Sequence, residues 1–208
     1  MTRTPFRAAT AALTTVLLAG TLAACGDADE PSAAPADAST TSAPPESPTE
    51  SATEEEPADG DRIAGQGYSY AVPEGWEDGT ERFQAISPLL DTGAVDTDVS
   101  QGFADNVNVI RNDSFPEMGL DEAEQQFVAE AETVSEDVQV RERAEIDGET
   151  VLHISGRTDA GKSKVRTEQY SLFREDAWYI VTFSFAEKSP DTTVDADVTT
   201  VLGSWQWE

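Results

Sequence analysis

The stretch of residues 26–61 contains no Val, Ile, Leu, Met or aromatic residue. It holds six prolines and eleven acidic residues among Ala, Ser and Thr. Such a segment cannot bury enough apolar surface to offset the entropy lost on ordering, so we expect it to be disordered. Proline and like charges both extend a chain, which predicts an elongated tether. Aliphatic and aromatic residues return at Ile63, so we place the folded domain at residues 63–208, an ordinary size for one domain.

Residues 1–24 are predicted to be a secretory signal peptide. Residues 1–7 carry two arginines and no acid, and residues 8–24 are uncharged and rich in Ala, Leu and Val. A basic start, an apolar middle and small residues at the end are typical of such a signal. The apolar part is shorter than the ~20 strongly apolar residues of a transmembrane helix, and Thr and Gly dilute it.

The end of this segment, Leu22-Ala23-Ala24-Cys25, resembles a bacterial lipobox. The resemblance implies cleavage between Ala24 and Cys25, a diacylglycerol thioether on Cys25, and an acyl chain such as palmitate on the new amino terminus. A cysteine suits this chemistry because a thiolate is the nucleophile that takes the lipid. Two or more acyl chains form an anchor that does not readily dissociate. We therefore expect a cell-membrane protein that faces the extracytoplasmic side, with residues 25–62 as lipidated cysteine and linker.

The chain is strongly acidic, with 41 Asp and Glu against 13 Lys and Arg and a net charge of −28. Signal cleavage would remove two arginines, leaving 13 − 2 = 11 basic residues and a net charge of 11 − 41 = −30. Such a surface repels nucleic acid, whose binding needs Lys and Arg contacts to phosphate. We predict no nucleic-acid partner; the charge suits solubility, cations or a basic partner.

Apolar patterning within residues 63–208 predicts an α+β domain. Strands are expected at residues 68–72, 82–89, 107–110, 138–146, 150–155, 165–173 and 178–185. Residues 91–101 read as a polar loop, and Val138, Val140, Ala144 and Ile146 as one face of an alternating run. Helices are expected at residues 120–134, with Asp121 and Glu124 as a capping pair, and after Ser189-Pro190-Asp191. Turns are expected at Pro73-Glu74-Gly75, Asp147-Gly148 and Glu175-Asp176.

Three stretches together resemble the Mog1/PsbP-like group, which includes many actinobacterial lipoproteins. They are the GYSYAVPEGW of residues 67–76, the NVNVI of residues 106–110, and the DAWYIVTFSF of residues 176–185 leading into a C-terminal helix. The resemblance covers residues 63–208. It implies an antiparallel β-sheet with helices on both faces, an α/β/α sandwich. It also implies a binding or assembly accessory rather than an enzyme, and it brings no catalytic set and no cofactor.

The motif GRTDAGKS, residues 156–163, fits the phosphate-binding pattern G-x-x-x-x-G-K-[ST]. A phosphate-binding loop requires a helix directly after it. The following residues are rich in Val, Thr, Tyr and Phe, which favour a strand. A later apolar strand ending in a magnesium-binding Asp is also missing, and export would move the domain away from ATP. We therefore predict a hairpin turn here.

Other motifs point weakly to chemistry. His153 is the only histidine, so it cannot form a metal cluster with other histidines, and we expect it to project from a strand. Residues 67–71 lack the last glycine of G-x-S-x-G and are not followed by a helix. Two acidic sets are oxygen-rich enough for Ca²⁺ but match no EF-hand loop, which favours a solvated acidic surface; they are Asp91, Asp96 and Asp98, and Asp191, Asp195 and Asp197.

The favoured hypothesis from sequence is a lipid-anchored binding or accessory module of the bacterial envelope that contacts a protein or small ligand. Trp205 and Trp207, at the chain end, are candidates for a partner-binding patch. Two alternatives remain open: an envelope hydrolase that uses a pair of acidic residues, and a structural envelope protein without a specific ligand. No catalytic residue, metal ligand or cofactor is assigned.

Overall fold

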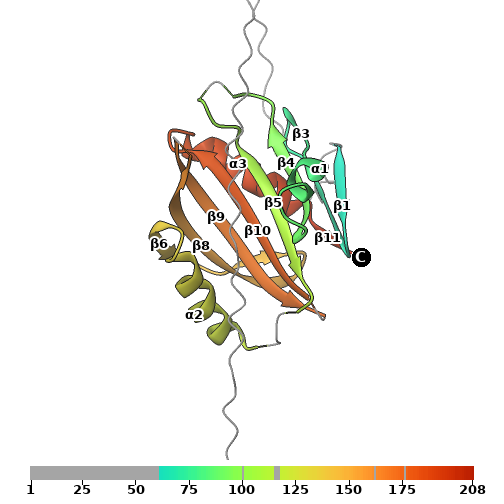
Figure 1. The fold of residues 1–208 in the computed structure, drawn as a ribbon. Helices are drawn as coiled ribbons and strands as arrows, with labels where there is room; N and C mark the ends of the chain where they lie inside the picture. The colour runs from blue at the N-terminus through green and yellow to red at the C-terminus, as the bar shows by residue number, and fades with distance from the viewer. Residues whose placement is uncertain (1–60, 100, 115–117, 162, 176) are drawn as a thin grey trace, which may run out of the picture. The chain divides into compact units, whose positions relative to one another are not determined.

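A large antiparallel sheet organises the residues that the computed structural model describes, which are 61–208 except 100, 115–117, 162 and 176 (Figure 1). Its strands lie in the order β3-β4-β5-β10-β9-β8-β6. Their bounds are β3 Trp76–Asp78, β4 Leu90–Asp96, β5 Asn106–Asn112, β10 Ala177–Ala186, β9 Ser163–Arg174, β8 Glu149–Ala160 and β6 Glu136–Val140, with β7 (Ala144–Ile146) also paired to β8. A smaller sheet joins β1 (Arg62–Gly65), β2 (Tyr68–Ala71) and β11 (Gln206–Trp207).

The central strand β10 is buried along its whole length because it lies between β5 and β9 and is covered on both faces. Successive side chains of a strand point to opposite faces. Tyr179, Val181, Phe183 and Phe185 accordingly pack into one core cluster, as the sequence predicted. Trp178 and Ile180 pack into the other.

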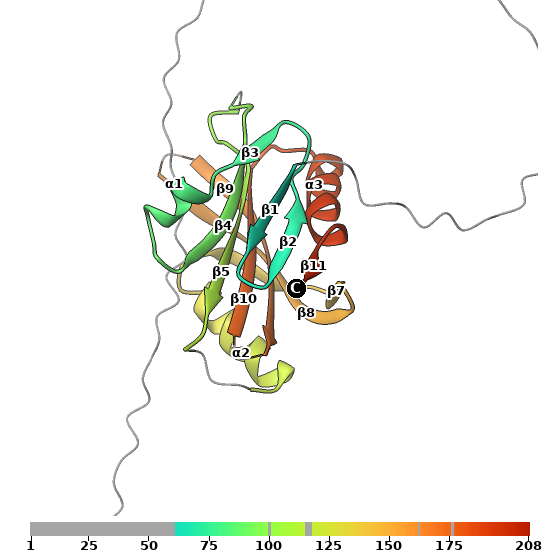
Figure 2. The same ribbon diagram turned by 90° about the vertical axis from the view of Figure 1, so that its right-hand side faces the viewer.

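Helices cover both faces of the large sheet, which confirms the predicted α+β arrangement. On one face, α2 (Leu120–Ala131) packs Ala123, Phe127 and Ala131 against apolar residues of β8 and β10. On the other, α3 (Asp191–Gly203) packs Val194 and Val201 into the core together with the small sheet (Figure 2). The small sheet is an addition to the predicted architecture.

Two hairpins follow the turn chemistry of the sequence. Asp147 (φ 46°) and Gly148 (φ 80°) join β7 to β8 with two positive φ angles, which an Asp-Gly pair adopts readily. The GRTDAGKS stretch bridges β8 and β9, with Ala160 opposite Ser163 and Gly161 at φ 64°. Strand β9 begins directly after this turn, where a phosphate-binding loop would be followed by a helix. The predicted hairpin is therefore confirmed.

The predicted strand at residues 82–89 is wrong, and the predicted polar loop at residues 91–101 is wrong for residues 91–96, which belong to β4, while residues 97–99 and 101 lie outside any helix or strand. Residues Thr80–Gln84 form a short helix, α1, and the following residues turn into β4. Phe83 is 1% exposed and lies over Gly93 of β4, where an added Cβ would come 2.3 Å from the Phe83 ring. The residues of β4 are small and polar, and for this reason their sequence resembles a loop. The same small size leaves room for the Phe83 ring.

The helix at residues 120–134 is confirmed in place but ends at Ala131, and its predicted cap is wrong. The residue before the helix is Gly119, with extended backbone and no side-chain cap. Asp121 and Glu124 instead form ion pairs with Arg143, at 2.7 Å and 3.3 Å. Because the helix begins at Leu120, Asp121 lies inside its first turn and not at the capping position, and its carboxylate is free to pair with Arg143.

The side chains from Val138 to Ile146 do not all point to the same face of the sheet. Val140 pairs with Ile154 of β8, whereas Ala144 pairs with Val151, so the register slips by one residue between β6 and β7. A one-residue slip turns side chains to the opposite face. Val138 therefore packs on the α2 side and Ile146 on the α3 side, which corrects the single-face prediction.

Candidate binding groove

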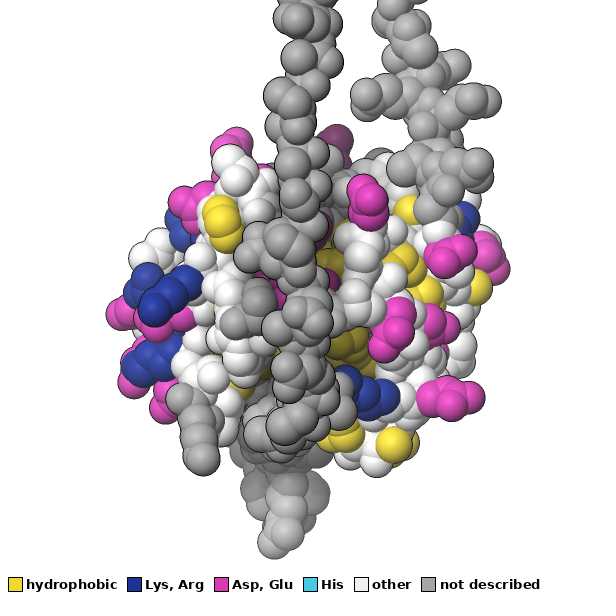
Figure 3. Space-filling model, turned by 90° about the horizontal axis from the view of Figure 1, so that it is seen from above, with side chains coloured by type: hydrophobic (Ala, Val, Ile, Leu, Met, Phe, Trp, Pro, Cys, Tyr) yellow, Lys and Arg dark blue, Asp and Glu magenta, His cyan; other side chains and the backbone are white. Residues whose placement is uncertain are grey.

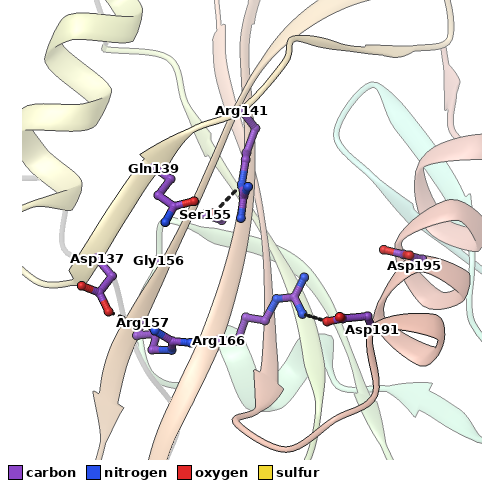
Figure 4. A pocket seen from close by; sticks show the side chains of 9 residues that line it. All are labelled: Asp137, Gln139, Arg141, Ser155, Gly156, Arg157, Arg166, Asp191 and Asp195. Carbon is purple, nitrogen blue, oxygen red and sulfur yellow. Dashed lines mark hydrogen bonds and ion pairs between the residues drawn. The ribbon is translucent and has the colours of Figure 1, made fainter.

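Two cavities that share lining residues form a groove on the α3 side of the large sheet, and Figure 4 shows the larger one. Their volumes are about 470 and about 290 Å³, and both are lined by Arg141, Arg166 and Asp195. Strands β6, β8 and β9 supply the floor, and α3 supplies the wall. The remaining lining residues are Asp137, Gln139, His153, Ser155, Gly156, Arg157, Glu168, Tyr170, Asp191, Val194 and Val198.

Strand register brings the polar floor residues together. His153 lies opposite Tyr170, Ser155 opposite Glu168, and Arg157 opposite Arg166. Paired residues of an antiparallel ladder project to the same face, so alternate residues of both strands gather there. The sequence of β9 alternates accordingly, with the charged side chains on one face of the strand.

The floor is held rigidly by a buried carboxylate. Glu168 is 5% exposed and accepts hydrogen bonds from Arg166 Nε and the His153 ring, both at 2.9 Å. Burial by itself raises the pKa of Glu168, but the hydrogen bonds from His153 and Arg166 outweigh burial, so its pKa is lowered and it is a carboxylate. The His153 ring also stacks on Tyr170, with centroids 4.2 Å apart.

This arrangement lacks the features of a serine hydrolase. Among the described residues, the side-chain hydrogen bond of His153 goes to Glu168 and not to a serine. The nearby Ser155 hydroxyl accepts a hydrogen bond from Arg141 Nε at 2.8 Å. His153 thus projects from a strand, as predicted, and acts as a packing and hydrogen-bonding residue in the floor.

Most charges in the groove are neutralised by neighbours. Arg157 pairs with Asp137 at 3.0 Å. Arg166 pairs with Glu168 and also with Asp191 at the start of α3. These contacts fix the positions of the floor and of the helix that forms the wall.

Arg141 and Asp195 differ from the other charged groups of the groove. Within the described part of the chain, neither forms an ion pair. The Arg141 guanidinium is oriented by its bond to Ser155, and its backbone N–H donates to His153 O at 2.9 Å. Figure 4 shows both side chains directed toward the cavity, Arg141 from the floor and Asp195 from α3. Their charges remain available to a ligand.

Acids with raised pKa values lie elsewhere. Burial raises the pKa of Asp105, although this carboxylate accepts bonds from Ala186 N at 2.7 Å and Ser189 Oγ at 2.9 Å. Burial, then the charges of Asp96 and Asp105, raise the pKa of Asp197 to about 6. Neither Asp105 nor Asp197 lines the groove. A hydrolase would need such an acid facing its substrate.

The two C-terminal tryptophans have different environments. Trp205 is 3% exposed and stacks on Tyr68 and Tyr70, with centroids 4.5 and 5.4 Å away. Trp207 is half-buried, with the Arg174 guanidinium 4.9 Å above its ring. A partner patch at this end would therefore present Trp207 and its covering arginine rather than Trp205.

The other sequence motifs that fall within the described residues form no site there. Ser69 lies within β2 and its hydroxyl accepts a bond from Arg62 at 3.0 Å. In residues 61–208, gaps aside, no three His, Cys, Asp or Glu side chains are placed to hold a metal ion. No helix in the same residues is long and apolar enough to cross a bilayer. The lipobox residues Leu22, Ala23, Ala24 and Cys25 lie outside the described residues.

Surface charge is unevenly distributed despite the acidic composition. Figure 3 shows more Lys and Arg side chains on the left of this view, the side on which β6 and β8 lie in Figure 1, than on the right, where some also lie. Asp and Glu side chains surround them and also occupy the opposite side.

The sequence matches no protein-family profile and no curated protein. Several solved structures have a similar arrangement. The mycobacterial LpqN, described as involved in cell envelope biogenesis of Mycobacterium tuberculosis, is 13% identical with a TM-score of 0.48, covering 74% of this chain and 86% of LpqN. Cyanobacterial PsbP from Synechocystis is 18% identical with a TM-score of 0.49, covering 71% of this chain and 92% of PsbP. The Ran-binding protein Mog1p from Saccharomyces cerevisiae is 11% identical with a TM-score of 0.46, covering 68% of this chain and 90% of Mog1p. These likenesses concern the fold and carry no inference about activity.

The sequence analysis named His153, Asp191 and Asp195, but as a strand residue and as part of an acidic set, and not as parts of one groove. The alternation of charges in residues 164–168 could have indicated a charged strand face. Arg141 gave no signal in the sequence, and its placement in one groove with Asp195 depends on the β6–β8 register and on where α3 docks.

Proposed function

We propose that this chain is a lipid-anchored, extracytoplasmic binding module of the bacterial envelope that recognises its ligand in the groove between the β6–β8–β9 floor and α3. Cys25 would carry the lipid, and residues 26–62 would hold the domain away from the membrane. The groove supplies recognition, and no catalytic step is assigned to it.

The observation that carries this proposal is the state of Arg141. Its guanidinium faces the cavity, is oriented by Ser155, and has no ion pair among the described residues. An arginine pre-positioned in this way can form a two-point contact with an anionic group at little entropic cost. The combined cavities have the size of a small-molecule or peptide site.

Binding is favoured over hydrolysis by the placement of the acids. In the groove, Glu168 and Asp191 are used in ion pairs, and Glu168 has a lowered pKa. A carboxylate held ionised by arginine is a poor proton donor. A groove with oriented charges also argues against a purely structural role without a ligand.

The proposal is tested by site-specific photo-crosslinking in intact cells. A photoreactive amino acid replaces Gln139, which is exposed at the groove, or Glu122, which is exposed on α2 at the opposite face. We expect ultraviolet-dependent adducts from position 139 and not from position 122. Equal adducts at both positions, or none at position 139, would refute the groove as the binding site.

A further inference from the structure

The groove contains a residual pair of opposite charges. The lining of the larger cavity includes three arginines and three aspartates, whose charges balance, and Glu168 of the smaller cavity adds one further carboxylate. Arg157 pairs with Asp137, and Arg166 pairs with both Asp191 and Glu168, the latter also hydrogen-bonded to the His153 ring. Among the described residues, the charged side chains of the groove that form no ion pair are one cation, Arg141, and one anion, Asp195, which both line the two cavities.

We infer that the groove binds a small zwitterion of the amino-acid or short-peptide class, with its carboxylate on Arg141 and its ammonium group on Asp195. This inference rests on the proposed binding function and adds the chemical class of the ligand. A zwitterion satisfies both residual charges at once. A simple anion would leave Asp195 without a partner, and a simple cation would leave Arg141 without one.

The charge of the whole chain favours the same class. With a net charge of −28, the protein repels an anion at long range and attracts cations without selectivity. A neutral zwitterion experiences neither effect, so its binding depends on short contacts inside the groove. Arginine is also suited to a carboxylate, because its planar guanidinium can donate two parallel hydrogen bonds.

The smaller cavity adds an apolar surface beside the charges. Val194 and Val198 of α3 line it, and the stacked His153 and Tyr170 rings form the facing part of the floor. Such a surface accepts an aliphatic side chain better than a second charge. The ligand expected is therefore a zwitterion with a small aliphatic substituent, such as an alanine-containing peptide.

The test is isothermal titration calorimetry of the purified full-length protein with alanine, Ala-Ala and Ala-Ala-Ala, which differ in the separation of their end charges. Matched probes are the N-acetyl and the C-terminal amide forms of each, which remove the ammonium or the carboxylate charge. We expect one length to bind best, and each blocked form to bind roughly tenfold to a hundredfold more weakly, because a hydrogen bond to a charged group is lost.

Two variants assign the contacts. Arg141→Gln should abolish the preference for the free peptide over its amide, and keep the preference over the acetylated form. Asp195→Asn should abolish the preference for the free peptide over its acetylated form, and keep the preference over its amide. Arg82→Gln and Glu122→Gln change charge outside the groove and should leave affinity and both preferences unchanged. Circular dichroism of each variant checks that it is folded.

Binding that is insensitive to both groove variants, or equal binding of free and blocked peptides, would overturn the inference. So would the failure of every alanine ligand to bind. If position 139 still forms specific adducts in cells in that case, the groove remains a binding site and only its zwitterionic specificity fails. If position 139 forms none, the proposed function fails as well.

Discussion

Replacement of Asp197 by Asn should make this protein more stable at neutral pH and leave its stability unchanged in acid. Asp197 lies on α3 and is half-buried. Its pKa is raised to about 6, first by burial and then by the charges of Asp96 and Asp105. No hydrogen bond or ion pair to its carboxylate is found among the described residues, so its ionisation is uncompensated.

The direction and the magnitude of this stability change follow from the difference between the folded and the unfolded pKa of Asp197. The unfolded pKa is about 3.9, so between about pH 4 and pH 6 the folded protein binds the proton more tightly, and stability falls as the pH rises through this window. A difference of about two pKa units corresponds to about 3 kcal/mol for a fully desolvated group. Because part of the carboxylate remains in contact with water, which screens its charge, we expect about 1–2 kcal/mol.

The assay is urea-induced unfolding of the wild type and the Asp197→Asn variant at pH 4, 5, 6, 7 and 8. The variant should gain about 1–2 kcal/mol in unfolding free energy at pH 7 to 8, and close to nothing at pH 4. The control is Asp195→Asn, an exposed site two residues earlier on the same helix. It corrects for the general benefit of removing one negative charge from an acidic protein.

A gain that is the same at pH 4 and pH 8 would refute this reasoning. So would a loss of stability at pH 8, or an equal gain in the Asp195→Asn control. The first result would show that the effect does not come from ionisation, and the last that it comes from net charge alone.

Three other changes test separate parts of the structure and of the proposed anchoring. Cys25→Ala should move the protein from the membrane to the soluble fraction or block its maturation; unchanged membrane retention after fractionation would contradict lipidation. Gly93→Ala should lower the unfolding free energy by about 1–3 kcal/mol, because the new Cβ would lie 2.3 Å from the Phe83 ring, and the same change in a Phe83→Leu background should cost less in denaturant melts. Asp105→Ala should cost about 1–3 kcal/mol in thermal unfolding, because it leaves the buried Ala186 N–H unpaired; a neutral result would show that the bond contributes little.

Strong local signals were sufficient for several elements. The alternation in β10 and the Asp-Gly and Gly161 turns identified strands and hairpins, because their side-chain period and positive φ angles are properties of a few adjacent residues. The helical stripe of Ala123, Phe127 and Ala131 identified α2 for the same reason. These predictions needed no knowledge of distant contacts.

Other elements depended on contacts that no local pattern contains. β4 is polar and small, and it is a strand because β3 and β5 pair with it and the Phe83 ring fits over Gly93. The cap predicted at Asp121 does not form because the helix begins one residue earlier, and Asp121 pairs with Arg143 from another segment. The one-residue register slip near Arg141 similarly redirects side chains that a single alternating strand would keep together.

The sequence alone therefore determined which part of the chain can fold, the α+β class, and the main hairpins and helices, because burial and turn chemistry are encoded in composition and spacing. It also supplied the lipobox at Cys25, which stays a prediction. The tertiary structure decided the groove. Arg141 and Asp195 are far apart in sequence, and only strand register and the docking of α3 direct both charges into one cavity while their neighbours neutralise each other.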